Sequence, residues 1–528
     1  MMNFDKMKKL AGKGRVSRRE FIQYGLAAGV SVAAADAMFA EAVRAQPKTG
    51  GLFKVGSGHG STTDSLDPAT WENNFTSDFG TGLMGDTLVN IDQTNSPVPN
   101  LAESFEAADG AKRWIYKLKR GVEFHNGKTL TAQDVVATYN HHRGKDSKSA
   151  VKSVLKPVTE IKADGPDTVI FTLEAGSADF PYITSDYHLP IFPAKDDGTI
   201  AWDKGVGTGA YILESYDPGV RLKVKRNPNY HGTAYFDEIE MLTIADVVAR
   251  TNALNTGAVH YIDRCDLKTL NLLRRNPKVV ISDVTGFAHY VTPMNVTVAP
   301  FDDVHVRKAI KYSFNRDEIL DKILFGHGTV GNDNPIAPSI KYATQPMPIH
   351  RYDPDKAKFH LKKAGVSSLK LDLSTSDAAF AGAVDAALLM KEHAKAANID
   401  INVIREAADG YWSNVWMKKP WCFSYWGGRP TVDWMMTTAY AAGASWNDTF
   451  WNNARFNELL VAARAETDQK ARAAMYAEMQ QILHDDGGII VLMFNNYVSA
   501  NLKDVAHGKL NSNYDHDGGY MHQRWWFV

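Results

Sequence analysis

Leu369-Lys370-Leu371-Asp372-Leu373-Ser374 alternates apolar and polar side chains, which predicts a strand with one buried face. Apolar residues then recur at helical spacing between Ala381 and Ala397. A second strand-like segment, Asp400 to Arg405, follows. Strand, helix and strand in this order predict a parallel strand pair covered by a helix, and therefore an α/β fold.

Segments on both sides of this unit also alternate between strand and helix patterns. Thr131 precedes a helical pattern, and Asp134 three residues later is placed for a capping box, so we expect a helix to begin there. Gly365 follows the helical pattern of Asp355 to Ala364, as expected for the residue after a helix. We expect further strands at 51–56, 114–119, 167–173 and 488–494, and further helices at 304–314, 316–325, 456–465 and 469–485.

Residues 1–45 have the pattern of a twin-arginine signal peptide. The arginine pair at 18–19 and Phe21 precede a mild apolar run that ends near Val43 in small residues. The basic residues before it are Lys6, Lys8, Lys9, Lys13 and Arg15. We expect export by the twin-arginine machinery, cleavage after Ala45 and a mature protein in the periplasm. The alternative is an amphipathic helix that contains a chance arginine pair.

The two cysteines, Cys265 and Cys422, lie far from the expected cleavage site. A lipid-anchored protein needs a cysteine at its new N-terminus, so we expect a soluble protein without a lipid anchor. A disulfide between the two cysteines and two buried, unpaired thiols both remain open.

Composition and motifs argue for binding and against catalysis. The chain has 59 Lys and Arg against 60 Asp and Glu, so no basic field predicts a nucleic-acid partner. No nucleophile elbow, zinc-binding helix or phosphate-binding loop is present. Adjacent residues on a helix point about 100° apart, so His141-His142 is a poor chelate. We expect no enzyme activity, no metal and no cofactor.

Several blocks in order along the chain resemble the extracellular solute-binding proteins of ABC importers, of the peptide, dipeptide and nickel type (family 5). The blocks are Ser65–Pro68, Pro99–Phe105, Leu118–Val135, Gly207–Tyr211, Arg226–Tyr230 and Phe301–Ile310 with Asn315-Arg316. The resemblance implies an α/β, two-lobed periplasmic binding protein fold of the large type, with an extra domain and a hinge that closes on the ligand.

The resemblance also implies how the mature chain divides. Lobe I is expected to comprise 46–90, 205–295 and 497–528, the extra domain 91–204, and lobe II 296–496. The partners it implies are a small organic ligand and the ABC permease subunits at the inner membrane. We expect the protein to be a monomer.

Aromatic residues gather between 411 and 451 and predict one wall of a ligand cleft. In peptide-binding relatives, a Trp-rich turn carries an acid that holds the amino group of the ligand. The similar stretch here, 424–434, contains Arg429, whose guanidinium favours a carboxylate or phosphate. We expect Arg429 to contact the ligand. The alternative is that it pairs with Asp433 or Glu406 and only holds the turn.

The remaining expected ligand contacts come from this turn, from lobe I and from a polar-aromatic loop. Trp434 is instead expected in the core, and Asp433 either binds an ammonium or orients Arg429. The full set of expected ligand-binding residues is Arg429, Trp426, Gly427, Asp433, Trp71, Tyr290, Trp446 and Asn447.

We therefore expect a periplasmic binding protein that captures a peptide or an acidic, opine-like amino-acid conjugate by lobe closure and delivers it to a permease. Ordinary di- or oligopeptides, sugars, glycosides and metal complexes are further ligand classes. The alternative functions are a secreted hydrolase and a periplasmic chaperone that reuse the scaffold.

Overall fold

A parallel strand pair covered by a helix forms where the sequence predicts it. The computed structural model describes residues 6–7, 10–11, 16–32, 34–36, 38–39, 47–466 and 468–528. Strands β14 (Leu369–Thr375) and β15 (Ile399–Arg405) pair in parallel, from Leu369 opposite Ile399 to Thr375 opposite Arg405. Helix α13 (Ala383–Ala394) connects them and buries Ala386, Ala387 and Met390. The predicted α/β class is confirmed in this unit.

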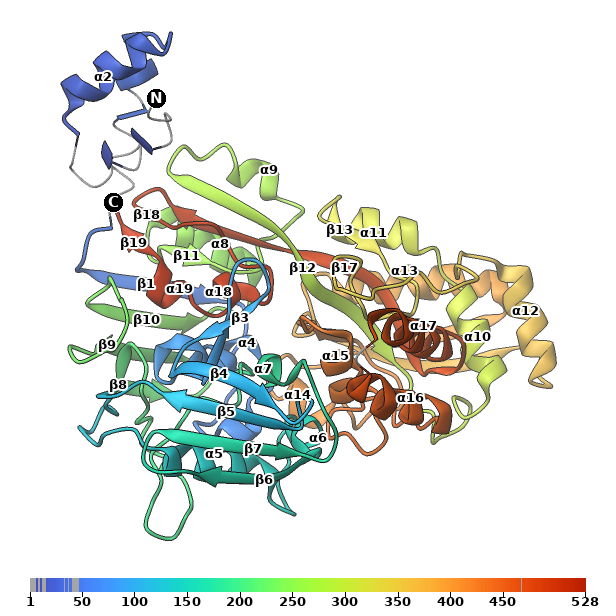
Figure 1. Cartoon of the computed structure of the whole chain (residues 1–528). Helices are drawn as coiled ribbons and strands as arrows, with labels where there is room; N and C mark the ends of the chain where they lie inside the picture. Colours follow the sequence, from blue (N-terminus) through green and yellow to red (C-terminus); the bar gives the residue numbers. More distant parts are fainter. Residues whose placement is uncertain are drawn as a thin grey trace.

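A larger mixed sheet joins the two lobes (Figure 1). Its order is β16 (Ser424–Trp426), β12 (Val279–Pro293), β17 (Ile489–Leu502), β11 (Tyr261–Ile262), β1 (Leu52–Ser57), β10 (Glu238–Thr243), β9 (Arg221–Arg226) and β8 (Tyr211–Asp217), with β13 (Gly328–Val330) on β17. Strand β1 runs parallel to β10 and β11, and the other pairs are antiparallel. The carboxyl ends of β1, β10 and β11 therefore meet at one edge.

The strands β12 and β17 cross from one lobe to the other. They pair from Val279 opposite Leu502 to Pro293 opposite Ile489, and the register shifts between Thr285 and His289. We predicted a strand that ends at residue 494, but β17 continues to Leu502 because its second half pairs with β12 and β11 in lobe I. The residue boundaries of the lobes and the extra domain stay a prediction, and their names are kept below.

The segment expected as the extra domain contains an antiparallel sheet of order β4 (Ala102–Ala108), β5 (Arg113–Leu118), β7 (Thr168–Leu173) and β6 (Val158–Ala163). Helix α5 (Ala132–Arg143) packs on this sheet and begins with the predicted capping box of Thr131 and Asp134. Burial alternates along β5 and β7, so one face of the sheet forms a core. Trp434 of α15 (Val432–Ala439) enters that core and is fully buried, as expected for a core residue.

Helices cover the sheets of lobe II. They are α10 (Val304–Tyr312), α11 (Arg316–Leu324), α12 (Pro354–Lys363), α16 (Ala454–Ala465) and α17 (Gln469–Asp486). Local signals start and stop them: Asn315 accepts a hydrogen bond from the backbone of Glu318 at 3.2 Å, and Gly365 after α12 has φ +77°.

Short elements complete the chain. They are η1 (Pro68–Thr70), α4 (Asn74–Asp78), η2 (Phe79–Leu83), β2 (Val89–Ile91), β3 (Pro97–Pro99), α6 (Lys152–Leu155), α7 (Phe180–Ile183), α8 (Val247–Thr256), α9 (Leu270–Leu273), η3 (Lys395–Ala397), α14 (Tyr411–Asn414), β18 (Val505–Ala506), α18 (Asp515–Gly518), α19 (Met521–Arg524) and β19 (Trp526–Phe527). His516 and Asp517 within α18 have φ of 56° and 58°, so this element is a tight turn.

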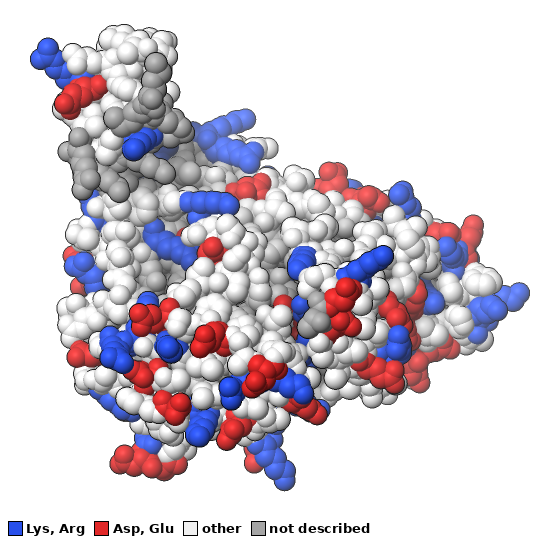
Figure 2. Space-filling view, in the orientation of Figure 1, with Lys and Arg blue, Asp and Glu red and all other residues white. Residues whose placement is uncertain are grey.

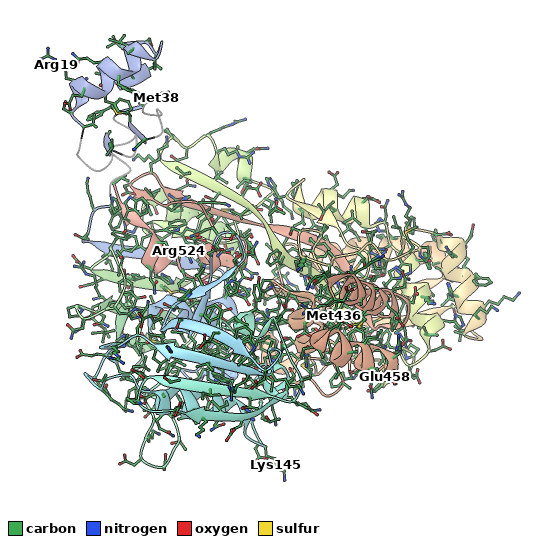
Figure 3. All side chains as sticks on the ribbon, viewed as in Figure 1. Arg19, Met38, Lys145, Met436, Glu458 and Arg524 are labelled. Carbon is green, nitrogen blue, oxygen red and sulfur yellow. The ribbon has the colours of Figure 1, made fainter. Side chains whose placement is uncertain are left out.

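The N-terminal segment lies apart from the body of the protein, where Arg19 and Met38 mark it in Figure 3. Its helix α2 (Arg18–Ala27) begins with a capping box of Ser17 and Glu20. Phe21 is buried against neighbours within the same segment, such as Phe39. The expected cleavage position after Ala45 lies outside the described residues.

Charged side chains of both signs share the surface, and both cysteines lie inside the protein. Figure 2 shows Lys and Arg interspersed with Asp and Glu over the visible face. Cys265 and Cys422 are both buried and free, so the expected alternative of a disulfide between them is not formed. Of the described helices, none is both long enough and apolar enough to cross a membrane.

Candidate ligand-binding site

A cavity of about 370 Å³ lies between the lobes, at the carboxyl edge of β1, β10 and β11. Residues of both lobes line it, including His59 and Arg264 of lobe I and Tyr425 of lobe II. A smaller cavity of about 50 Å³ shares Asn74, Tyr425, Gly427 and Tyr514 with it. The combined space suits a small organic ligand, because such sites usually measure about 300–1,000 Å³.

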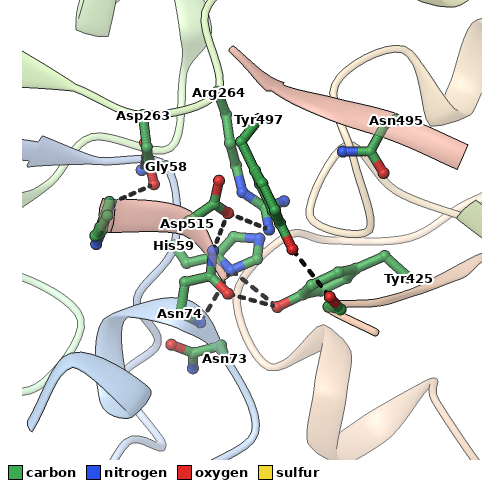
Figure 4. A network of polar contacts seen from close by, with 12 residues as sticks. Gly58, His59, Asn73, Asn74, Asp263, Arg264, Tyr425, Asn495, Tyr497 and Asp515 are labelled. Atoms are coloured by element: carbon green, nitrogen blue, oxygen red, sulfur yellow. Dashed lines mark hydrogen bonds and ion pairs between the residues drawn. The ribbon is translucent and has the colours of Figure 1, made fainter. Parts of the chain in front are cut away.

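An arginine and an acid face the larger cavity (Figure 4). The guanidinium of Arg264 lies 3.4 Å from the carboxylate of Asp515 and 4.7 Å from the ring centre of Tyr425. Asn74 donates a hydrogen bond to Asp515 and accepts one from the Tyr425 hydroxyl at 3.3 Å. The strand edge and the C-terminal turn thus bring opposite charges to the wall of the cavity.

A second layer of charges lies beneath this pair. His516 lies between the carboxylates of Asp78 and Asp263, and its Nε2 is 3.3 Å from Asp263. Arg250 lies 3.5 Å from Asp263 on the other side. Burial lowers the pKa of His516, but the two carboxylates outweigh it and hold that pKa well above its usual value. His516 is therefore protonated at neutral pH.

Tryptophans form one wall of the smaller cavity. Trp416, Trp426 and Trp446 pack edge to face with ring centres 5.6 to 6.3 Å apart. The indole of Trp416 donates to Asp448 at 3.1 Å. Burial raises the pKa of Asp448 to about 7. This wall offers flat apolar faces to a ligand.

Arg429 brings a nearly buried positive charge to the smaller cavity, with 2% of its surface exposed. Its Nη1 donates to the carbonyl of Gly428 at 2.7 Å, and its guanidinium lies 5.4 to 5.8 Å from the ring centres of Tyr187, Trp434 and Tyr514. Within the described part of the chain, no carboxylate lies within 4 Å of it, and its Nε has no hydrogen-bond partner. The buried carboxylate of Asp186 acts on Arg429 from a longer distance but pairs directly with His188 at 2.6 Å, so no carboxylate pairs directly with this arginine.

The structure brings five of the predicted ligand-binding residues to these cavities. Arg429, Trp426, Gly427 and Trp446 line the smaller one, and Tyr290 lines the larger one, where its ring stacks on Phe380 at 3.8 Å. Whether they contact a ligand stays a prediction.

The other three predicted residues, Trp71, Asp433 and Asn447, do not line either cavity. Trp71 is fully buried and donates to the carbonyl of Ser65 at 3.0 Å. Asp433 pairs with Arg464 at 3.1 Å. Asn447 donates to the carbonyls of Ala441 and Trp451, at 3.2 and 2.7 Å. Their partners in the core hold these side chains away from the cavities.

The alternative of an Arg429 ion pair with Asp433 or Glu406 is wrong. Asp433 is taken by Arg464, so it neither pairs with nor orients Arg429, and Glu406 accepts a hydrogen bond from Ser374 at 2.8 Å.

Sequence reasoning assigned no ligand-binding role to Arg264, Asn74, Tyr514, Asp515 or His516. No local pattern marks these residues, because Asn74 and Asp515 meet across 441 positions of the chain. Over the described ranges, no group of three or more His, Cys, Asp or Glu side chains is arranged to hold a metal ion.

Polar contacts join the two lobes. Asp409 of lobe II accepts hydrogen bonds from Thr62 Oγ1 at 3.1 Å and from Ser61 Oγ at 3.3 Å. Lys268 of lobe I pairs with Asp385 of lobe II at 2.5 Å. The lobes are therefore closed over the site.

Comparisons with known proteins agree with this architecture. The model for bacterial extracellular solute-binding proteins, family 5 (Middle), matches residues 96–448. The glutathione-binding protein GsiB of Pectobacterium atrosepticum is 25% identical over 479 residues, which cover 85% of this chain and 90% of GsiB.

Two solved structures show the same fold. The periplasmic binding protein DppA of Helicobacter pylori, in complex with the peptide STSA, has a TM-score of 0.82 at 22% identity and covers 91% of this chain and 98% of its own. The binding protein AgaA of A. tumefaciens R10, in complex with agropinic acid, has a TM-score of 0.82 at 20% identity over 90% and 99% of the two chains. These likenesses confirm the predicted two-lobed periplasmic binding protein fold.

Proposed function

Because this chain belongs to the bacterial extracellular solute-binding proteins of family 5, we propose that it captures a small carboxylate-bearing solute between its lobes and delivers it to an ABC permease. The solute is a peptide or an acidic, opine-like amino-acid conjugate. Lobe closure over the ligand presents the closed form to the permease.

The unpaired charge of Arg429 is the observation that supports a carboxylate. A buried guanidinium without a carboxylate partner is costly, and a ligand carboxylate removes this cost with charge-assisted hydrogen bonds. The rings of Tyr187, Trp434 and Tyr514 fix the guanidinium in place, so little side-chain entropy is lost when the ligand binds.

Relatives support ligands of this kind. GsiB is named for glutathione, and AgaA binds agropinic acid. The peptide complex of DppA keeps ordinary peptides as a candidate class. The aromatic wall of Trp416, Trp426 and Trp446 suits the apolar part of any of these ligands.

We also propose an export route, a location and an oligomeric state for the protein. The arginine pair at 18–19 supports twin-arginine export to the periplasm, and the distance of Cys265 and Cys422 from the expected cleavage site supports a soluble protein without a lipid anchor. We propose that the protein is a monomer. The family binds solutes for transport, and we propose that this chain catalyses no reaction of its own.

A thermal-shift panel on the mature chain, stripped of carried-over ligand, tests the proposal. The probes are glutathione, Ala-Ala and Ala-Ala amide, which lacks the carboxylate of Ala-Ala. A probe at 100 times its Kd raises the stability of the fold by about 2.7 kcal/mol. We expect a shift with at least one carboxylate probe and none with the amide.

Arg429→Met should abolish that shift, whereas Arg455→Met should keep it. Arg455 is the matched control because it lies exposed on α16 and pairs with Glu478 at 2.7 Å, away from the cavities. An unchanged affinity in Arg429→Met, a shift with the amide as large as with Ala-Ala, or no shift with either carboxylate probe would contradict the proposal.

A further inference from the structure

We infer that Arg264 and Asp515 form a receptor for the head group of an α-amino acid. Arg264 takes the α-carboxylate and Asp515 takes the α-ammonium, while Arg429 takes a second carboxylate at the other end of the ligand. This inference rests on the proposed function and names its substrate class. The ligand is an amino acid conjugated so that both α-groups stay free.

Arg264 and Asp515 lie together at the wall of the larger cavity. Arg264 follows β11 and has φ +46°, a left-handed conformation that is strained for an arginine and that is found mostly at functional sites. Asp515 follows Tyr514, whose ring lies 5.8 Å from the guanidinium of Arg429. Two consecutive residues of the C-terminal turn therefore contact both arginines, and both of these residues line the larger cavity.

The neighbouring pair Arg250–Asp263 differs from Arg264–Asp515 in its hydrogen bonds. Arg250 donates to the backbone carbonyls of Ile244, Ala245, Asp263 and Arg264. In the described structure, the guanidinium of Arg264 makes no such hydrogen bond to the backbone; it contacts the Asp515 carboxylate at 3.4 Å and the Tyr425 side chain. The Arg250–Asp263 pair is saturated and structural, whereas the Arg264–Asp515 pair has donors left for a ligand.

The two ion pairs also differ in the exposure of their side chains. The side chains of Arg264 and Asp515 are 15% and 11% exposed, against 3% and 0% for Arg250 and Asp263. The outer pair therefore faces the cavity and the inner pair supports it. The distance of 3.4 Å between Arg264 and Asp515 is longer than the roughly 2.7–2.9 Å of a charge-assisted hydrogen bond, which leaves both groups able to bind a better partner.

The charge balance identifies the ligand further. The carboxylates of Asp78, Asp263 and Asp515 balance Arg250, Arg264 and protonated His516. A zwitterionic head group adds no net charge to this set, so the set stays balanced when the head group binds. Near Arg429, the buried carboxylate of Asp186 pairs directly with His188 at 2.6 Å, so the positive charge of Arg429 has room for one more anion. The structure assigns a ligand with one ammonium and two carboxylates.

Two isomeric probes test this assignment. γ-Glutamylglycine carries the ammonium and a carboxylate on one carbon and a second carboxylate at its far end. α-Glutamylglycine has the same formula and charge, but its α-carboxyl is used in the peptide bond. Titration calorimetry on the ligand-stripped mature protein should show binding of the γ-isomer at least tenfold tighter than that of the α-isomer. Equal binding of the two, or no binding of the γ-isomer, would overturn the inference.

Variants assign the effect to the pair. Asp515→Asn and Arg264→Lys should each weaken γ-glutamylglycine at least tenfold and bring the two isomers close to equal affinity. Asp377→Asn is the matched control, because it removes a carboxylate that lines the same cavity and leaves Arg264 untouched. A loss in Asp377→Asn as large as in Asp515→Asn would show a general charge effect and would overturn the inference.

The inference and the proposed function fail separately. If Arg429→Met abolishes carboxylate binding while the two isomers bind equally, the carboxylate site stands and the head-group receptor is wrong. If Arg429→Met has no effect, the proposed function is wrong whatever the isomers do. Because the isomer ratio is measured on the unmodified protein, a variant that fails to fold does not decide the result.

Discussion

Removal of the Asp409 carboxylate should open the lobes of the ligand-free protein. Asp409 follows β15 of lobe II, and it accepts hydrogen bonds from the hydroxyl and backbone N–H of Thr62 at 3.1 and 3.3 Å and from Ser61 at 3.3 Å. These bonds join the two lobes and exist only when the lobes are closed. They hold the pKa of Asp409 below its usual value, so its carboxylate is charged at neutral pH.

The size of the effect follows from the exposure of the contact. Hydrogen bonds to a charged group contribute about 1.5–3 kcal/mol when shielded, but exposed ion contacts contribute about 1 kcal/mol or less. Asp409 is exposed while Ser61 is buried, so we take about 1–2 kcal/mol for the set. This corresponds to a change of roughly 5- to 30-fold in the ratio of closed to open protein. The apparent affinity for ligand falls in proportion to the closed fraction.

Single-molecule energy transfer between dyes on the two lobes measures this ratio. Val220→Cys in lobe I and Phe359→Cys in lobe II are exposed positions for the dyes, and the two native cysteines are buried. Asp409→Ala should shift the ligand-free distribution toward open molecules. Asp400→Ala is the control, because Asp400 is exposed on β15, the strand that precedes Asp409, and forms none of these hydrogen bonds. Identical distributions for Asp409→Ala and the unmodified lobes would refute the reasoning.

Three further predictions concern the supporting structure. His516→Asn should cost about 3–5 kcal/mol at pH 7, because it leaves two facing carboxylates without a cation. His516 gains its proton on folding, so its contribution to the free energy of unfolding is complete below a pH of about 6.5 and is lost as the pH rises toward its folded pKa. Denaturant titrations at several pH values should show this pH dependence only in the protein that contains His516. Asp448 has a pKa of about 7, so Asp448→Asn should change the melting temperature little at pH 4 and raise it at pH 8; a lower value at pH 8 would contradict this. Gly428→Ala should destabilise the fold by more than about 2 kcal/mol, because the new Cβ would lie 2.3 Å from Phe287. In the control Gly443→Ala the new Cβ has free space, and the cost should be about 1 kcal/mol. Equal melting temperatures of the two variants would contradict the steric argument.

The strands and helices that local patterns in the sequence predicted are present in the structure. The β14–α13–β15 unit and the capping box at Thr131 depend on residues a few positions apart, and the structure has both. The prediction for β17 was too short because its last residues pair with β12 and β11, whose partners the periodicity of a single segment does not show.

The candidate site was predictable only in part. The turn with Arg429 was found because its composition is unusual and because it resembles a family motif. The pairing of Asp433 with Arg464 was not predicted, since Arg464 lies 31 residues away in sequence. Arg264 and Asp515 were missed because nothing beside either of them in the sequence indicates the other.

The sequence by itself determined the α/β class, the family, the balanced charge and the twin-arginine pattern, because each depends on composition or on residues close together in the chain. The tertiary structure alone decided which charges are paired and which face the cavity. Burial removes water from a charged group, so its partners within a few ångströms control its energy. In this protein those partners come from segments hundreds of residues apart, as with Asn74 and Asp515.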